Sequence, residues 1–135
     1  METTERPVHA GYDGPFATPD VVEGDDHRCP HMLWAKWDED EDGVDAHIGF
    51  FRTKDGLIAI QSMQSNRDVR GRDMLKWIAG YGLPLHVVEV VPEAMGFWDR
   101  MMTEDRIVDW EPATGWPSAL ERRAIAFPQA VKEAA

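Results

Sequence analysis

The stretch SNRDVRGRDMLKWIAG, residues 65–80, leads from a predicted strand into a predicted helix through a loop that carries three arginines and a glycine. Beyond the loop, apolar side chains recur at helical spacing from Met74 to Tyr81, so we expect a helix that begins at Asp73. Such a turn can receive a phosphate, because the first amides of a helix are unpaired and point at an incoming anion. The same residues also fit a capped helix, since the Asp73 carboxylate accepts those amides itself and repels an anion.

The segment before this loop predicts a sheet. Three strands are expected at residues 31–39, 45–53 and 57–65, because short turns with Gly43 and Gly56 separate runs rich in apolar residues. Turns this short join neighbouring strands that run in opposite directions. The spacing therefore predicts an antiparallel meander.

The stretch LPLHVVEVV, residues 83–91, follows the helix, which Gly80 or Gly82 is expected to end. Its nearly continuous apolar character predicts a buried central strand. Strict alternation along a strand places His86 and Glu89 on opposite faces. Burial of Glu89 in this strand is expected to raise the pKa of its carboxyl group toward neutral pH.

A helix at residues 92–102, a strand at 106–112 and a last edge strand at 119–128 complete the order of elements. Ala, Leu and Glu at the start of the last segment leave room for a helical turn. The order predicts an α+β (mixed α/β) fold, in which an antiparallel meander is followed by β-α-β and the helices pack on a central twisted sheet. The division that we expect is an irregular N-terminal arm, a single domain and a C-terminal tail, at residues 1–30, 31–128 and 129–135.

The chain is acidic: its 25 aspartates and glutamates outnumber its 14 lysines and arginines, which gives a net charge of -11. This charge disfavours direct binding to nucleic acid. The run DEDEDGVD at residues 38–45 is interpreted as a solvated turn. The polar N-terminus and the lack of a long apolar run predict a cytoplasmic protein without a membrane span.

One short segment contains residue types that bind metals. His27, Cys29 and His31 alternate, and on a strand they would share one face. Zinc uses such ligands, but this spacing is not that of a zinc finger, and the chain has a single cysteine. We therefore expect no metal site and no internal disulfide.

Two motifs carry a resemblance to a known family. RGRDML, at residues 70–75, stands where the loop Arg-Gly-x-Gly-x-Gly/Ala occurs in the GNAT superfamily of N-acetyltransferases; Arg70 and Gly71 match, whereas Asp73 and Leu75 replace small residues. The later stretch VVEVVPEAMGFWDRMM resembles the strand and the helix that follow in that family. From residue 31 onward, the order of elements resembles the second half of the GNAT fold, so the expected domain is GNAT-like.

The resemblance implies an acyltransferase. In the family, a meander leads through a pyrophosphate loop into a helix, and a buried strand then splays away from its neighbour. The protein is therefore expected to bind acetyl-CoA and to move an acetyl or related acyl group to an amine of a small molecule, a modified base or a protein lysine. Residues 1–30 leave little room for the family's acceptor side, which must be truncated or rebuilt. The cofactor-binding residues that the resemblance implies are Met63, Ser65, Arg67, Arg70, Gly71, Arg72, Asp73 and Met74.

The candidate catalytic residues are Glu89 and Ser62, which are placed to act on protons, and Trp98, which stands where the family often has a tyrosine. An indole N–H donates a hydrogen bond but cannot deliver a proton. His47 and His86 are further acid–base candidates.

Asp73, Leu75 and Trp98 all depart from the catalytic pattern of the family, so a second function stays open. The protein could be a catalytically degenerate relative that acts as an acidic protein-binding or inhibitor module. Its acidic turn at residues 38–45 would then engage a basic partner or mimic the phosphates of DNA. The predicted edge strand near the C-terminus could also pair with a second copy to form a homodimer.

Overall fold

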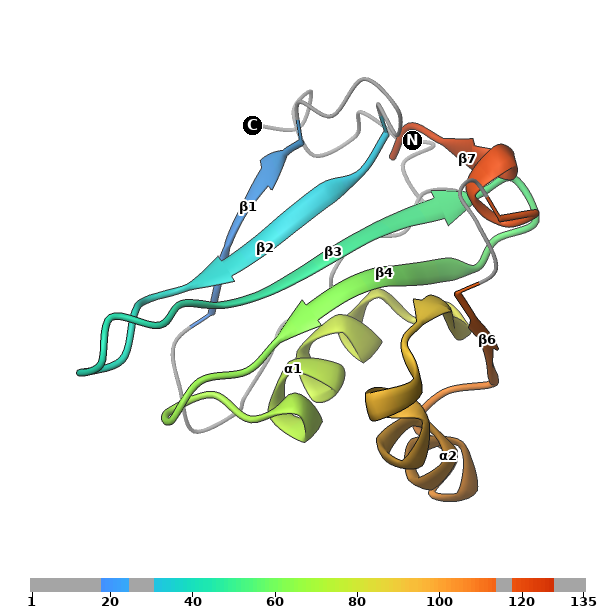
Figure 1. Cartoon of the computed structure of the whole chain (residues 1–135). Helices are drawn as coiled ribbons and strands as arrows, with labels where there is room; N and C mark the ends of the chain where they lie inside the picture. The colour runs from blue at the N-terminus through green and yellow to red at the C-terminus, as the bar shows by residue number, and fades with distance from the viewer. Residues whose placement is uncertain (1–17, 25–30, 114–117, 128–135) are drawn as a thin grey trace.

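The computed structural model describes residues 18–24, 31–113 and 118–127. It shows a twisted, open sheet of seven strands with α1 and α2 packed on one face (Figure 1). The strands are β1 (Asp20–Glu23), β2 (Leu33–Trp37), β3 (Ala46–Thr53), β4 (Ile58–Gln64), β5 (Leu85–Val90), β6 (Asp109–Pro112) and β7 (Ala124–Ile125). The helices are α1 (Gly71–Ile78), α2 (Met95–Thr103) and the short 3-10 helices η2 (Ala79–Tyr81), η3 (Pro92–Ala94) and η4 (Glu121–Arg123).

The sheet is mixed and follows the order β1-β2-β3-β4-β5-β6. Strands β1 to β4 pair antiparallel, which confirms the predicted meander, whereas β4, β5 and β6 are parallel. Parallel neighbours need crossover connections, and α1 and α2 supply two that step in the same direction along the sheet. Crossovers of one hand that step in one direction place their helices on the same face, as Figure 1 shows. The predicted α+β class is confirmed.

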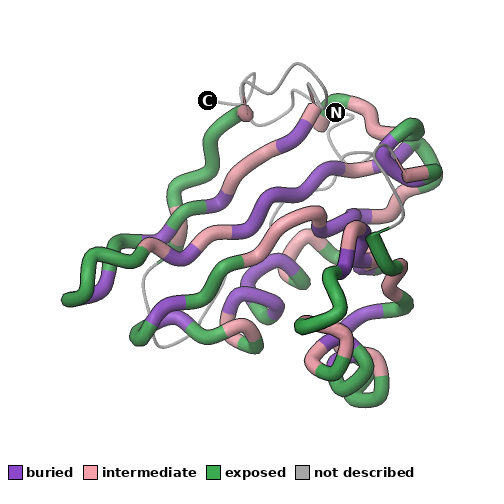
Figure 2. Tube along the Cα trace, in the orientation of Figure 1, coloured by how far each residue is buried: buried purple, intermediate pink, exposed green. Residues whose placement is uncertain are grey.

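The sheet separates two apolar clusters, because successive residues of a strand point to opposite faces. The larger cluster, the helix-side core, packs Phe50 of β3 against Trp77 of α1 and includes Trp98 of α2. The smaller one lies on the opposite face, which we call the outer face, and consists of Met32, Phe51, Ala59, Val88 and Leu120. Figure 2 shows that buried residues follow the central strands, whereas β1 is exposed along its length.

Part of the predicted irregular arm is a strand. β1 pairs antiparallel with β2 and forms the edge of the sheet. Its sequence, DVVE, has only two apolar residues and no alternation. This strand is therefore stabilised by backbone pairing with β2 and not by burial of its side chains. Residues 1–17 and 25–30 of the arm, which include His27 and Cys29, lie outside the described residues.

Helix α1 begins two residues earlier than predicted. Arg70 is the N-cap, with extended backbone angles, so the helix starts at Gly71 and Asp73 is its third residue. Its last turn tightens into η2, which ends at Gly82 with a φ of 77°. Glycine adopts this left-handed conformation without steric cost, which confirms Gly82 as the terminating residue.

The predicted last strand is mostly replaced by a helical turn. η4 occupies its first half, and β7 has only two residues, which pair with the end of β3 at Arg52 and Thr53. This position lies beyond the last residue of β3 that pairs with β2. None of the helices in the described ranges has the length and apolar character needed to cross a bilayer.

Candidate functional site

Strands β4 and β5 diverge in the middle of the sheet. Their pairing ends at Ile60↔Val87, although β4 continues to Gln64 and β5 to Val90. Beyond that pair, the backbone edges of the two strands no longer bond each other. A divergence of this kind is what the resemblance implied for this pair of strands.

Each strand carries a bulge where the pairing ends. The register of β4 against β3 skips Gln61, and the register of β5 against β6 shifts between Val87 and Val90. Inside the second bulge, Glu89 has a φ of 60°, which is rare for a residue other than glycine. Bulges bend a strand and end its pairing, so the two irregularities account for the divergence.

A cavity of about 220 Å³ lies between the diverging strands. The three candidate catalytic residues, Ser62, Glu89 and Trp98, all line this cavity, and so does Met63. The structure therefore brings these predicted site residues together. The other lining residues are mostly apolar: Ile60, Gln61, Val87, Val88, Val90, Val91 and Ala94.

The bulge in β5 overturns the predicted orientation of Glu89. Val87 and Val90 both pack in the helix-side core, so the two-residue period is broken between them. The side chain of Glu89 instead hydrogen-bonds Glu121 of η4, beside the outer-face cluster. His86 belongs to the same face through its pairing with β4. The prediction that His86 and Glu89 face opposite ways is therefore wrong.

The surroundings of Glu89 favour its neutral form. Burial raises the pKa of its carboxyl group to about 7, from an ordinary value of 4.5, and a hydrogen bond to Glu121 and repulsion by Glu121 and Glu111 act in the same direction. A group that titrates near neutral pH can both accept and return a proton. The apolar strand predicted the effect of burial, but it gave no sign of the two neighbouring carboxylates.

Glu121 is a site residue that sequence reasoning missed. It is 7% exposed, and its carboxylate accepts hydrogen bonds from the N–H of Ser118 at 2.7 Å and from the side chain of Gln61 at 3.3 Å. The Glu121 N–H in turn donates to Ser118 Oγ at 3.1 Å. The motif SALE at residues 118–121 is a Ser-x-x-Glu capping box, but nothing in the sequence connects it to Glu89.

The loop between β4 and α1 is built around acceptor side chains. Asp40 accepts the N–H of Arg67 at 2.9 Å, and this bond is the largest cause of the lowered pKa of Asp40. Asn66 Oδ1 accepts the N–H groups of Asp68 and Val69 at 2.9 and 2.8 Å. These loop amides are therefore bound within the protein and cannot bind an anion. The acidic run is thus more than the predicted solvated turn, because Asp40 shapes the loop.

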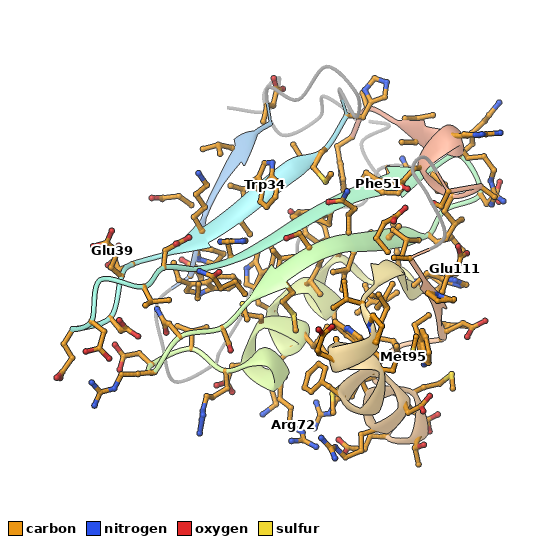
Figure 3. The ribbon with its side chains drawn as sticks, viewed as in Figure 1. Trp34, Glu39, Phe51, Arg72, Met95 and Glu111 are labelled. Carbon is orange, nitrogen blue, oxygen red and sulfur yellow. The ribbon has the colours of Figure 1, made fainter. Side chains whose placement is uncertain are left out.

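The three arginines of the loop differ in their partners. Arg67 pairs with Asp42 at 3.1 Å. Arg72 points from α1 toward Glu104 at the end of α2, where it forms an ion pair of 2.7 Å (Figure 3). In the part of the chain that the structure describes, no carboxylate forms an ion pair with Arg70. Arg70 is therefore the arginine that is best placed to bind an anion.

Asp73 does not close the start of α1. It accepts the N–H of Arg70 at 3.3 Å, and its own N–H donates to the Arg70 carbonyl. Among the described residues, no acceptor binds the N–H groups of Gly71 and Arg72. Gly71 also approaches Phe97 so closely that an added Cβ would lie 2.9 Å from the ring. Two amides at the start of α1 therefore have no acceptor among the described residues, which is fewer than the predicted phosphate-binding turn would offer.

The remaining residues implied by the resemblance are less suited to a ligand. The side chain of Met74 is fully buried in the helix-side core, and its N–H donates to the Arg70 carbonyl at 3.1 Å. Ser65 is exposed directly after β4. Trp98 lines the cavity but is only 5% exposed, because it packs in the helix-side core, and its ring lies edge-on to Phe97 at 4.8 Å.

His47 lies in a separate hollow of about 440 Å³ on the outer face. Its Nδ1 hydrogen-bonds Asp45 Oδ2 at 2.8 Å, and its ring packs edge-on with Trp34 at 5.4 Å. The lining of this hollow comes from β1, β2, β3 and the segments next to them, and it includes neither Ser62 nor Glu89. The structure therefore does not bring His47 to the cavity between β4 and β5.

These features define an α+β protein with an open mixed sheet and a cavity where two parallel strands diverge. Comparisons of the chain with protein-family models, with curated proteins and with solved structures found no match.

Proposed function

We propose that the protein is a GNAT-like N-acyltransferase that moves an acetyl or related acyl group from CoA to an amine. The observation that carries this proposal is the cavity between β4 and β5, which Ser62, Glu89 and Trp98 line and from which β4 leads into the loop and α1. The unpaired edges of the two strands present N–H and C=O groups to an extended ligand that has amides of its own. The pantetheine arm of CoA is such a ligand.

Glu89 supplies the proton chemistry of this reaction. An amine must lose its proton before it attacks, and a free alkylamine is protonated at neutral pH. A carboxylate whose pKa is about 7 accepts that proton more readily than an ordinary carboxylate. As the C–N bond forms and the C–S bond breaks, the leaving thiolate needs a proton, and protonated Glu89 can return one. Trp98 cannot, because an indole N–H does not ionise in this range.

The diphosphate of CoA would bind at the start of α1. The N–H groups of Gly71 and Arg72 and the guanidinium of Arg70 are the groups that can hold it there, with support from the helix dipole. Asp73 lies beside these groups and opposes an anion. We therefore expect an affinity in the micromolar range rather than tighter binding.

Isothermal titration of the full chain with acetyl-CoA tests the proposal. We expect Arg70→Ala to weaken binding about tenfold or more, because a hydrogen bond to a charged group contributes roughly 1.5–3 kcal/mol. Arg100→Ala, at an exposed position on α2, is the matched control and should leave the Kd unchanged. No heat of binding at millimolar acetyl-CoA would refute the transferase.

A second function is favoured by a different observation. The acidic turn binds the backbone N–H of Arg67 through Asp40 and pairs with its guanidinium through Asp42, so this arginine already has acidic partners within the chain. A catalytically degenerate protein that binds a basic partner through its acidic turn would show this arrangement. In that case acetyl-CoA does not bind, whereas a lysine-rich peptide binds and is weakened by Glu39→Gln, at an exposed position of the turn (Figure 3).

A further inference from the structure

We propose that Glu121 is a positioning residue for Glu89: from η4, it holds the Glu89 carboxyl group at the cavity and shares one proton with it. The catalytic meaning of this inference rests on the proposed function. The sharing of the proton is a property of the fold, however, and it can be measured without a substrate. Glu121 itself does not line the cavity, so it acts on a reaction there only through Glu89.

Contacts other than the one with Glu89 hold the Glu121 side chain in place. Its Oε1 accepts the N–H of Ser118 at 2.7 Å, and its Oε2 accepts a hydrogen bond from the Gln61 side chain at 3.3 Å. The capping box adds the bond from the Glu121 N–H to Ser118 Oγ at 3.1 Å. With both oxygens bound by donors and only 7% of the residue exposed, the Glu121 carboxylate has one defined position.

Glu89 reaches Glu121 because of the bulge in β5. Its φ of 60° takes it out of the strand alternation, and its side chain meets Glu121 across the outer face. The groups that face Glu89 from the neighbouring elements are the carboxylates of Glu121 on η4 and Glu111 on β6. The other elements around the cavity contribute uncharged side chains, among them Gln61 of β4 and Trp98 of α2.

Two carboxyl groups in hydrogen-bond contact share a proton, because two negative charges at that distance repel each other strongly. Donors that bind an ionised carboxylate favour its charged form. Both oxygens of Glu121 have such donors, whereas the structure shows none for Glu89 among the described residues. The shared proton therefore resides on Glu89, which donates it to Glu121.

This arrangement gives Glu121 a role that a purely structural residue would not have. While the proton is in place, the O–H of Glu89 is directed at a fixed acceptor, which orients the carboxyl group. When the proton leaves, repulsion from Glu121 and Glu111 favours its return. Glu89 is thereby maintained as a base that is partly protonated at neutral pH.

Replacement of Glu121 by glutamine tests the inference. The introduced amide keeps a carbonyl for the Ser118 N–H, so the capping box persists. Its NH2 group takes the place of the oxygen that accepts from Gln61, so the Gln61 amide must turn to present its own oxygen, and the NH2 group donates to the ionised Glu89. In a titration of carbon-13 carboxyl signals, we expect Glu121→Gln to lower the midpoint of Glu89 by about one pH unit or more. Glu93→Gln, at an exposed site near the end of β5, should leave this midpoint unchanged.

An unchanged Glu89 midpoint in Glu121→Gln overturns the inference. Glu111→Gln removes a charge without removing the hydrogen bond, so it should lower the midpoint by less; a larger effect than that of Glu121→Gln also overturns it. The titration needs no acetyl-CoA, so a lowered midpoint without acetyl-CoA binding supports the positioning role and refutes the transferase. If transfer is observed, the acidic limb of the pH profile of kcat/KM should move in Glu121→Gln by the same amount as the midpoint.

Discussion

Removal of the ionisable group at Glu89 should make the fold more stable at high pH. The carboxyl group has a pKa of about 7 in the folded chain, against an ordinary value of 4.5. Below pH 4.5 it is protonated in both states and has no effect on the pH dependence. Between these values the unfolded chain loses the proton while the folded chain keeps it, so the free energy of unfolding falls as the pH rises.

The magnitude follows from the same difference. At about 1.4 kcal/mol for each factor of ten in the ionisation constant, the upper limit of the loss is about 3.4 kcal/mol. Glu89 is partly exposed, so water screens the charge, and we expect a loss of about 1 to 2 kcal/mol. Glu89→Gln cannot ionise and keeps the size of the side chain. Its stability relative to the original chain should therefore increase by this amount between pH 4.5 and pH 8.

Urea unfolding at pH 4.5, 6 and 8 and constant salt measures the difference. Glu93→Gln serves as the control, because Glu93 is exposed on η3 and close to Glu89 in sequence. Its stability should differ from that of the original chain by the same small amount at every pH. If the difference in free energy of unfolding between Glu89→Gln and the original chain were also constant across the three pH values, ionisation of Glu89 would not destabilise the fold, and the prediction would be refuted.

Two further predictions concern the loop and the sheet. Asn66 is 8% exposed, and its side chain makes four hydrogen bonds, two of them to the carbonyls of Asp38 and Val44, so Asn66→Ala should lower the free energy of unfolding by about 2–4 kcal/mol in urea titrations. A Cβ on Gly49 would lie 2.8 Å from the rigid Trp34 ring, so Gly49→Ala should lower the thermal midpoint, with a cost of about 1–3 kcal/mol. Gly96→Ala in α2, where the added Cβ meets open space, should instead raise it slightly. Equal effects at the two glycines would contradict the packing argument.

The meander could be predicted because its signals are local. Gly43 and Gly56 adopt positive φ values in turns of a few residues, and the strands between them pair with their nearest neighbours in sequence. The crossovers from β4 to β6 follow equally from the helical spacing between apolar strands. β1 was not predicted, because its residues are exposed and its sequence has no hydrophobic pattern typical of a strand. Its formation depends on pairing with the edge of β2.

Some of the residues that line the cavity could be predicted from the sequence. Ser62, Glu89 and Trp98 all line it. Ser62 and Glu89 meet there because β4 and β5 are parallel neighbours, whereas Trp98 of α2 was expected from the family resemblance. The orientation of Glu89 could not be predicted, because a bulge is a property of the backbone that the valines on either side do not encode. The contact of Glu121 with Glu89 could not be predicted either, since a capping box indicates only the hydrogen bonds within its own helical turn.

The acidic turn explains why the loop before α1, which resembles a phosphate-binding turn, has few free groups that could bind an anion. An anion site needs backbone amides and cationic side chains that have no partner within the protein. The carboxylates of the acidic turn instead accept the loop amide and pair with the loop arginine. Asp40 takes the amide of Arg67, and Asp42 takes its guanidinium. The same contacts fix the loop before any ligand arrives, which lowers the conformational entropy lost on binding. If the proposed acyl-CoA ligand binds, this gain in order must outweigh the lost contacts, and Arg70 and the first two amides of α1 must supply the remaining binding free energy.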